Sequence, residues 1–484
     1  MTASTAAPTD LVTDSWIDRE WRSGDRVFDT INPSTAQPLA AVSAASIGDV
    51  DIAVSAAHRA YGRYARETAH TRAGWARSAA AAIRSNAERL ATVLSSEHGK
   101  PITEARGEIA FAAAGFDSAA DAVLSASGDV PHVQDPHKRV FVRRTGIGVW
   151  AVITPWNFPV NIPVEYIGPG LVSGNAVVWK PAPTTAAVAA ELRKVLLEAD
   201  FPQELLQLIL TDEVATANHL VTHPGVVAVG FTGGSTTGHA IAKAAWDKRL
   251  LLELGGNSPI VVLPDADPER TAEAIGASAF FNAGQVCSAA GKILTTAGFA
   301  DDLAAALTEQ ANRRVSGSPL DDSTTLGPVH LAASIDRFDT LIENAVTNGA
   351  TVLTGGAAIT GDGYYYPATV LTNVTKDSRI FTEETFGPVA SISVLGDEDQ
   401  LLAAANSGDF GLVGAVFTTN VSKAFAMAEQ IDCGLVVVND TTNYWEYSVP
   451  FGGAAGRLSG RGRLGSRYAL DEFTQVKAIA VDIR

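Results

Sequence analysis

Hydrophobic and polar positions follow different rhythms along the chain. Between residues 47 and 127 alanine is abundant, and apolar residues recur at the three- and four-residue spacing of helices. One such run ends at Gly99 and Pro101, two residue types that commonly end helices. No heptad repeat persists, so this region predicts packed surface helices rather than a coiled coil. The first dozen residues show no such spacing and predict a flexible arm.

From residue 147 onward, short apolar runs alternate with helical patterns. This alternation is typical of a parallel, doubly wound sheet, so we predict an α/β fold. In such sheets ligands bind beyond the carboxyl ends of the strands. Four polar or glycine-rich segments follow predicted strands there: TPWNFP, KPAP, FTGG and ELGG. The predicted strands of this sheet are 147–153, 176–180, 205–210, 226–231 and 249–254.

A second alternating stretch, from residue 258 to about Asn439, predicts another α/β domain. Two segments, 132–146 and 476–484, are extended, charged and detached from either domain. Exposed strand edges of this kind usually pair with another strand, so we predict a homodimer or homotetramer. The predicted parts are a cofactor-binding domain of 1–125 and 145–255, a catalytic domain of 256–453, and a small β oligomerisation element of 126–144 and 454–484.

Composition narrows the class of protein. A length of 484 residues predicts two or three domains, and a net charge of −17 argues against nucleic acid or an anionic membrane as partner. Two cysteines, Cys287 and Cys433, are too few for a disulfide framework. The chain starts without a secretory pattern, and no apolar stretch reaches the ~20 residues that span a bilayer. We therefore expect a cytoplasmic protein, and we predict no metal site.

Cys287 lies in NAGQVCSAAGK, among small residues instead of in an apolar run. A free cysteine is usually a buried, inert side chain, and the alternative is a nucleophile. Seven motifs that occur in order decide between these interpretations: ITPWNFP, VVWKPA, GFTGG, LELGGNSP, NAGQVCSAAGK, EETFGP and PFGG. Together they resemble the aldehyde dehydrogenase superfamily, which oxidises aldehydes with NAD(P)+, and the resemblance extends over nearly the whole chain.

The resemblance implies three catalytic residues. Cys287 would attack the aldehyde, Asn157 with the backbone N–H of Cys287 would stabilise the oxyanion, and Glu253 would activate the water that hydrolyses the thioester. Glu253 ends the apolar run RLLLEL, and such surroundings raise the pKa of a carboxylate. Without the resemblance, Asn157 would be interpreted as a helix cap and Glu253 as a strand-end carboxylate facing solvent.

The resemblance also implies a cofactor site. Lys180 would bind the adenosine ribose, Glu384 the nicotinamide ribose, and the backbone after Gly234 the pyrophosphate. Pro183 stands where NAD-preferring members often have glutamate, so NAD and NADP both stay open. The predicted cofactor residues are Thr154, Pro155, Trp156, Lys180, Pro183, Gly234, Ser235, Gly255, Glu384 and Phe386.

The substrate is less determined. Asn161, Glu165 and Tyr166, together with 439–448, are expected to line the entrance. Aromatic residues there favour an apolar or aromatic aldehyde. They are Trp156, Phe281, Tyr444, Trp445 and Phe451. The alternative is an anionic aldehyde such as a semialdehyde, bound by Arg457, Arg461 and Arg463.

Other function classes remain in view. A CoA-acylating dehydrogenase would share the thioester but would not need Glu253 as a base. A cysteine hydrolase needs a partnered histidine, and none of the nine histidines lies in a recognisable motif. A binding protein of this fold would not need Cys287, Glu253 and Asn157 together.

Overall fold

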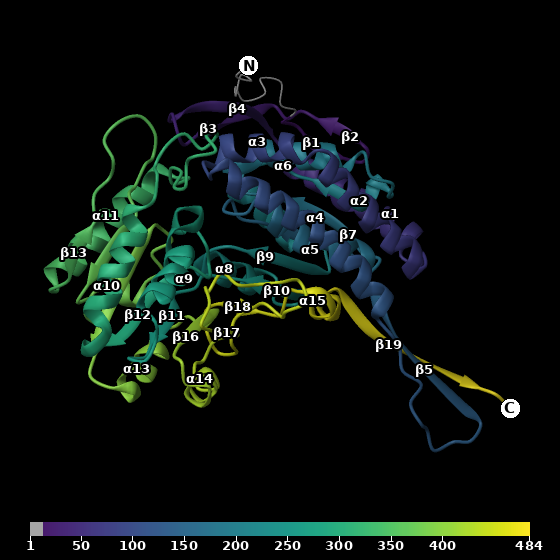
Figure 1. Cartoon of the computed structure of the whole chain (residues 1–484). Helices are drawn as coiled ribbons and strands as arrows, with labels where there is room; N and C mark the ends of the chain where they lie inside the picture. Colours follow the sequence, from purple (N-terminus) through teal and green to yellow (C-terminus); the bar gives the residue numbers. More distant parts are fainter. Residues whose placement is uncertain (1–12) are drawn as a thin grey trace.

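The computed structural model describes residues 13–484, so the predicted flexible arm lies outside the described residues. Figure 1 shows two α/β bodies side by side and a two-stranded arm that projects from the first of them. Each body has its own hydrophobic core, the first formed mainly by residues before 255 and the second by residues 260–437. The predicted α/β fold class is therefore confirmed.

Four short strands precede the first helix, and the sequence analysis did not predict them. β1 and β2 add antiparallel strands to one edge of the first sheet, while β3 and β4 form a separate ribbon. β1 and β2 have three residues each, and buried positions do not alternate regularly along β3 and β4, so no periodic run marks these strands. The strands are β1 (Ser15–Ile17), β2 (Glu20–Arg22), β3 (Arg26–Asn32) and β4 (Gln37–Ala44).

The alanine-rich region forms four helices, as predicted. Ser46 and Asp49 make a reciprocal capping box at the start of the first, and Gly99 ends the third with a left-handed φ of 94°. The fourth helix packs against the second and against α5, with small alanines at the contact. The helices are α1 (Ile47–Tyr64), α2 (Ala69–Ser85), α3 (Ala87–His98) and α4 (Ile102–Ser125).

The first sheet has the strand order β18-β10-β9-β6-β7-β8-β1-β2, and its five central strands are parallel. The strand order reverses between β6 and β9, which is where such sheets bind ligands. The parallel strands are β6 (Val149–Ile153), β7 (Ala176–Lys180), β8 (Leu206–Leu208), β9 (Ala228–Thr232) and β10 (Arg249–Glu253). The helices between them are α5 (Asn161–Val172), α6 (Ala186–Leu196), α7 (Val214–Thr222) and α8 (Ser235–Ala244), with short 3-10 turns at Pro183–Thr185 and Gln203–Leu205.

The second sheet has the order β13-β14-β15-β12-β11-β16-β17 and is parallel except for β13. Its strands are β11 (Ser258–Val262), β12 (Ala290–Thr296), β13 (Thr351–Thr354), β14 (Thr369–Thr372), β15 (Val389–Leu395), β16 (Val413–Phe417) and β17 (Leu435–Val438). Its helices are α9 (Pro268–Phe280), α10 (Ala297–Asn312), α11 (Ala332–Thr347), α12 (Arg379–Thr382), α13 (Glu398–Ala405) and α14 (Val421–Ala428).

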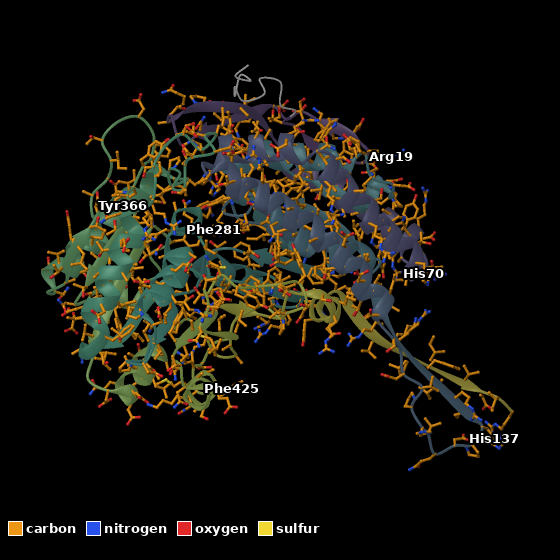
Figure 2. All side chains as sticks on the ribbon, viewed as in Figure 1. Arg19, His70, His137, Phe281, Tyr366 and Phe425 are labelled. Atoms are coloured by element: carbon orange, nitrogen blue, oxygen red, sulfur yellow. The ribbon has the colours of Figure 1, made fainter. Side chains whose placement is uncertain are left out.

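The C-terminal segment divides between the first body and the projecting arm. β18 (Gly460–Arg461) pairs with β10, and α15 (Ser466–Phe473) packs on α4 and α5, so these residues lie with the first sheet. The prediction had assigned all of 454–484 to the oligomerisation element. β19 (Thr474–Asp482) pairs along its whole length with β5 (Lys138–Gly146), so the two edges predicted to find partners pair with each other. Figure 2 places His137 near the tip of this arm.

Within residues 13–484, no helix combines the length and the apolar character needed to cross a membrane.

Candidate active site

The thiol of Cys287 is placed by an unusual turn after α9. The short 3-10 helix Phe281–Gly284 contains left-handed φ values of 51° at Asn282 and 53° at Ala283. The chain then runs past Gly256, where a Cβ would lie 2.2 Å from the carbonyl oxygen of Cys287. Only glycine permits this contact, so the link between β10 and β11 lies directly against the Cys287 loop.

A cavity of about 510 Å³ opens between the two bodies at Cys287. Phe281, labelled in Figure 2, lies at this junction. The lining residues are Thr103, Glu104, Gly107, Glu108, Phe111, Phe158, Asn161, Ile162, Glu165, Thr232, Glu253, Phe281, Val286, Cys287, Ser288, Asn443, Trp445, Phe451 and Leu464. Cys287 and Glu253 thus line the same cavity. Glu253 ends a strand of the first sheet, and Cys287 lies in a loop that leads into the second sheet.

The Asn157 side chain points toward the Cys287 loop. Its Nδ2 donates to the carbonyl oxygen of Gln285 at 3.0 Å, which fixes the amide and leaves its second N–H for another acceptor. Asn157 does not cap α5, because the first backbone N–H groups there, of Val160 and Asn161, donate to Glu108 Oε1. The helix-cap interpretation of Asn157 is therefore wrong, and a buried amide donor beside the thiol loop remains.

A buried ion pair between Lys100 and Glu108 holds the loop that carries Asn157. Lys100 Nζ lies 2.5 Å from Glu108 Oε2, and both side chains are about 1% exposed. The same ammonium donates to the backbone carbonyl of Asn157 at 2.9 Å, and Asn282 Nδ2 donates to that carbonyl at 3.1 Å. The sequence analysis missed Lys100 and Glu108, because a lysine after a helix-ending glycine looks solvated. Other charged residues lie nearby in the sequence, so nothing in the local pattern singles out this pair.

Glu253 ends β10 with its side chain buried. Neither carboxyl oxygen has a hydrogen-bond partner among the described residues. Burial, and secondly the charge of Glu165, raise its pKa well above the ordinary value, while the Arg463 guanidinium opposes them. Arg463 is close: a Cβ on Gly452 would lie 2.9 Å from Glu253 Oε1 and 3.0 Å from Arg463 Nη1. A carboxyl group with a raised pKa and free oxygens fits the predicted base.

The Cys287 thiol is surrounded by acid groups. Burial raises its pKa, and the charges of Glu384, Glu253 and Glu165 raise it further. The thiol is therefore the stable form in the empty site, and attack on a substrate requires a group that accepts its proton. Cys433 packs at the edge of the second core, where burial raises its pKa to about 12.

The predicted nicotinamide side of the site is well ordered. Glu384 Oε1 accepts from the backbone N–H of Gly256 at 2.9 Å, and a Cβ on Gly255 would lie 2.8 Å from Glu384 Oε2. Burial raises the pKa of Glu384 to about 7. Trp156 meets Phe386 edge-on, with ring centroids 5.5 Å apart. The absence of a side chain at Gly255 therefore lets the Glu384 carboxylate lie against this link.

The predicted adenosine side lies at the ends of β6, β7 and β9. Thr154, Pro155 and Trp156 follow β6, and the Thr154 hydroxyl accepts from the indole N–H of Trp179 at 2.9 Å. Lys180 ends β7, and burial lowers its pKa to about 8. Pro183 begins a 3-10 turn, and Gly234 precedes α8. The Ser235 hydroxyl donates to the Leu458 carbonyl at 3.2 Å, so its proton is already engaged.

Three residues expected at the substrate entrance lie elsewhere. Tyr444 is 41% exposed and is not among the residues that line the cavity. Tyr166 is fully buried against Gly230, and its hydroxyl hydrogen-bonds Thr232 at 2.7 Å. Asn161, Phe281, Trp445 and Phe451 do line the cavity. Trp156 lies outside it, stacked on His330 at 4.8 Å between ring centroids.

The three arginines proposed to bind an anion do not reach the cavity. Arg457 donates to Asp432 and to the carbonyl oxygens of two loop residues, which ties it to the second body. Arg463 donates to the carbonyls of Gly453 and Gly462, and Arg461 is exposed in β18. The lining described for the cavity contains no arginine, lysine or histidine.

One group of side chains in residues 13–484 could hold a metal ion, although none was predicted. Asp51, His219 and His223 bring their ligand atoms within 4.8 Å of one another on α1 and α7. The two imidazoles already pair with Asp51 Oδ1, at 2.6 and 3.3 Å. These residues do not line the Cys287 cavity.

Comparison with known proteins identifies the family. The sequence model of the aldehyde dehydrogenase family matches residues 20–479. The chain belongs to the aldehyde dehydrogenase family. The predictions of the family and of an enzyme of this class are thereby confirmed.

Relatives of this aldehyde dehydrogenase cover almost its whole length. It is 32% identical over 476 residues to 3-sulfolactaldehyde dehydrogenase of Priestia aryabhattai, covering 97% of this chain and 98% of that one. It is 32% identical to the NADP+ succinate-semialdehyde dehydrogenase of Escherichia coli, with 98% and 97% covered. The structure of betaine aldehyde dehydrogenase from Staphylococcus aureus in complex with NAD+ matches with a TM-score of 0.94 at 30% identity, covering 98% and 95%. Relatives of this dehydrogenase thus include users of either cofactor.

The Lys100–Glu108 pair generates a stability prediction. We expect Lys100→Met to lower the free energy of unfolding by about 3–5 kcal/mol, because it leaves the buried Glu108 carboxylate unpaired. Adding Glu108→Gln recovers part of this loss, since the amide oxygen still accepts from α5. Urea denaturation followed by tryptophan fluorescence measures both variants. Arg106→Met is the control, because Arg106 pairs with Glu88 and Asp322 at the surface. Equal stability of Lys100→Met and this control contradicts the prediction.

The charges around Cys287 generate a prediction about thiol reactivity. Without cofactor, alkylation of Cys287 by iodoacetamide is slow at pH 7 and rises as the pH rises, because only the thiolate reacts. Glu384→Gln removes the strongest of the neighbouring charges that raise the thiol pKa, so the rate at pH 8 increases severalfold. Peptide mapping by mass spectrometry follows Cys287 and uses Cys433 as internal reference. An unchanged Cys287 rate in Glu384→Gln would show that this charge does not act on the thiol.

Proposed function

We propose that this dehydrogenase oxidises an aldehyde to the carboxylic acid with NAD(P)+, through a thioester on Cys287. The observation that carries the proposal is the shared cavity of Cys287 and Glu253 beside the fixed amide of Asn157. A nucleophile, a base without a partner and an oxyanion donor then meet at one point, as acyl chemistry requires.

The first steps use Cys287 and Asn157. The thiol gives its proton to water in the cavity and the sulfur attacks the aldehyde carbon, so the carbonyl oxygen becomes an oxyanion. The free N–H of Asn157 Nδ2 and the backbone N–H of Cys287 donate to this oxygen, and one such donor is worth about 3–4 kcal/mol in the transition state. NAD(P)+, when bound, would supply the hydride acceptor, and loss of the hydride from the former aldehyde carbon would leave a thioester on the sulfur. Trp156, Phe386 and Glu384 are the residues that would hold the nicotinamide ring and its ribose.

The last step uses Glu253. Its carboxylate takes a proton from water while the water oxygen attacks the thioester carbon, which releases the acid and returns the thiol. Both carboxyl oxygens of Glu253 lack partners among the described residues, so they are free to bind this water. This feature supports hydrolysis over transfer to CoA, which does not need a base at this position.

The cavity supports a substrate that is not anionic. Its lining has five aromatic side chains, which suit an apolar or aromatic body. Succinate semialdehyde, the substrate of one relative, carries a carboxylate, and no basic side chain in this lining would pair with it. We therefore retain the apolar or aromatic aldehyde as the substrate and place the semialdehyde second.

Cofactor preference and assembly complete the proposal. Pro183 offers no carboxylate to a 2′-hydroxyl and no repulsion to a 2′-phosphate, so both NAD+ and NADP+ are proposed to serve.

The arm of β5 and β19 exposes Phe141, Val476, Ile479 and Val481, which supports its use as a contact between identical subunits. The expected cytoplasmic location remains a prediction.

Glu253→Gln tests the mechanism. The variant still forms the thioester once, so it gives a burst of reduced cofactor near one equivalent per site. Turnover then falls by about 10²–10⁴-fold, because the thioester lacks its general base. Stopped-flow absorbance measures the burst, and intact mass detects the acyl adduct.

Cys287→Ala is the matched control, with neither burst nor adduct in a folded protein. Normal turnover in Glu253→Gln would remove this glutamate from the mechanism. Absence of a burst together with slower thiol alkylation would make Glu253 the group that deprotonates Cys287. Turnover by Cys287→Ala would contradict the whole proposal.

Deletion of 476–484 tests the assembly. The full chain is expected to be a dimer or tetramer at micromolar concentration, and the deletion shifts it toward smaller species because β5 loses its partner strand. Light scattering after size exclusion measures the mass. Phe425→Ala, an exposed side chain on α14, is the control and leaves the mass unchanged. A monomeric full chain, or a deletion without effect, counts against the arm as the contact.

A further inference from the structure

The charged side chains that line the cavity are all acidic. Its lining contains four carboxyl side chains and, in the described part of the chain, no basic side chain. Two of the four are already satisfied. Glu108 pairs with Lys100, and Glu104 accepts from the backbone N–H of Asn282 at 2.9 Å. A third, Glu253, has the proposed role in hydrolysis.

Glu165 is the carboxyl group that the mechanism does not use. It lies on α5 one turn after Asn161, whose Nδ2 donates to Glu165 Oε1 at 2.6 Å. Asn161 Oδ1 in turn accepts from the Tyr447 hydroxyl at 2.5 Å, so the orientation of the amide is fixed. Glu165 Oε2 makes no hydrogen bond with residues 13–484, and part of the side chain is open to the cavity. Glu165 is therefore held in place at one oxygen and free at the other.

Glu165 is close to the reacting groups. Its charge is among those that raise the pKa of both Cys287 and Glu253. No lysine, arginine or histidine within residues 13–484 forms an ion pair with Glu165 or with Glu253. A carboxyl group inside a protein without a cation is unfavourable for stability, so its placement points to a ligand. In the empty cavity, burial raises the pKa of Glu165 to about 8.

Aromatic rings form another wall of the same cavity. Trp445 meets Phe111 and Phe451 edge-on, each with ring centroids 5.6 Å apart. Phe158 stacks on Phe281 at 6.1 Å. Aromatic faces attract cations and exclude anions, and a water-poor site strengthens this preference. A carboxylate and an aromatic wall are together the arrangement that selects an ammonium group.

We propose that the substrate is an aldehyde with a positively charged end, an amino- or trialkylammonio-aldehyde, whose cation binds between Glu165 and the aromatic wall. This inference rests on the proposed function, because it concerns the same cavity and the same reaction. It narrows the proposed substrate class: the apolar body of the aldehyde packs on the aromatic rings, and its charged end pairs with Glu165. The free Glu165 Oε2 is the acceptor for an N–H donor, or the counter-charge for a quaternary ammonium group.

Three aldehydes of similar length test the charge. The cationic probe is 4-(trimethylammonio)butanal, the neutral probe of the same shape is 5,5-dimethylhexanal, and the anionic probe is succinate semialdehyde. We expect kcat/KM to be at least about tenfold higher for the cationic than for the neutral probe, and lowest for the anionic one, because a hydrogen-bonded or paired charge is worth roughly this factor or more.

Glu165→Gln tests the residue. The amide keeps the shape and the bond to Asn161 but removes the charge, so kcat/KM for the cationic probe falls about 10- to 100-fold, mainly through KM. Removing the Glu165 charge also changes the pKa of Cys287 and Glu253, but that change acts equally on both probes. The ratio of kcat/KM between the cationic and neutral probes is therefore the readout, and it falls to about one. Glu343→Gln, on the exposed side of α11, is the matched control and changes neither value.

The outcomes separate the two proposals. No oxidation of any aldehyde with either cofactor contradicts the proposed function itself. Oxidation in which the neutral or anionic probe is preferred overturns only the cationic substrate. An equal loss for cationic and neutral probes in Glu165→Gln, with kcat falling and KM constant, assigns Glu165 to the geometry of the reaction centre and also overturns it.

Discussion

The ion pair of Lys100 and Glu108 is the interaction on which the geometry of the site depends. It joins the start of α4 to the loop after β6, because Glu108 also accepts the first backbone N–H groups of α5 and Lys100 also holds the Asn157 carbonyl. Through Asn282 and Gln285 the same network continues into the turn before Cys287. A buried ion pair adds little net stability over an apolar pair of the same size. Here the ion pair fixes relative orientation, because its donor and acceptor hold three backbone segments together: the start of α4, the loop after β6 and the start of α5.

The link between the two sheets is equally constrained. Gly255 and Gly256 run between Glu384 and the Cys287 carbonyl with no space for a side chain at either position. Glu253 on the first sheet therefore stays near Cys287 on the second, and the nicotinamide site stays beside both. The two hydrophobic cores form around separate sheets and are joined by this glycine link. A shift of either core would therefore move Glu253 relative to Cys287.

The regular elements and the proposed reacting residues were predicted from the sequence for different reasons. Apolar periodicity located the parallel strands and the alanine-rich helices, because each buries one strongly marked run. Motif order, not periodicity, identified Cys287, Glu253 and Asn157. The strands β1 to β4 were not predicted because they are short and their buried and exposed positions do not alternate regularly. The roles of Tyr166, Tyr444 and the arginines depend on which way a side chain leaves its element, which spacing along the chain does not reveal. Lys100 and Glu108 were not predicted, because a charged residue is normally solvated. Only the folded chain shows that this pair is buried.

The acidic surroundings of Cys287 have a consequence for the enzyme outside its catalytic cycle. Peroxides and other cellular oxidants attack thiolates and leave thiols largely untouched, and oxidation beyond the sulfenic acid is generally irreversible. Burial and three neighbouring glutamates keep this sulfur protonated while the site is empty. An enzyme awaiting substrate is thus shielded from oxidative inactivation by the same charges that its nucleophile must overcome during turnover.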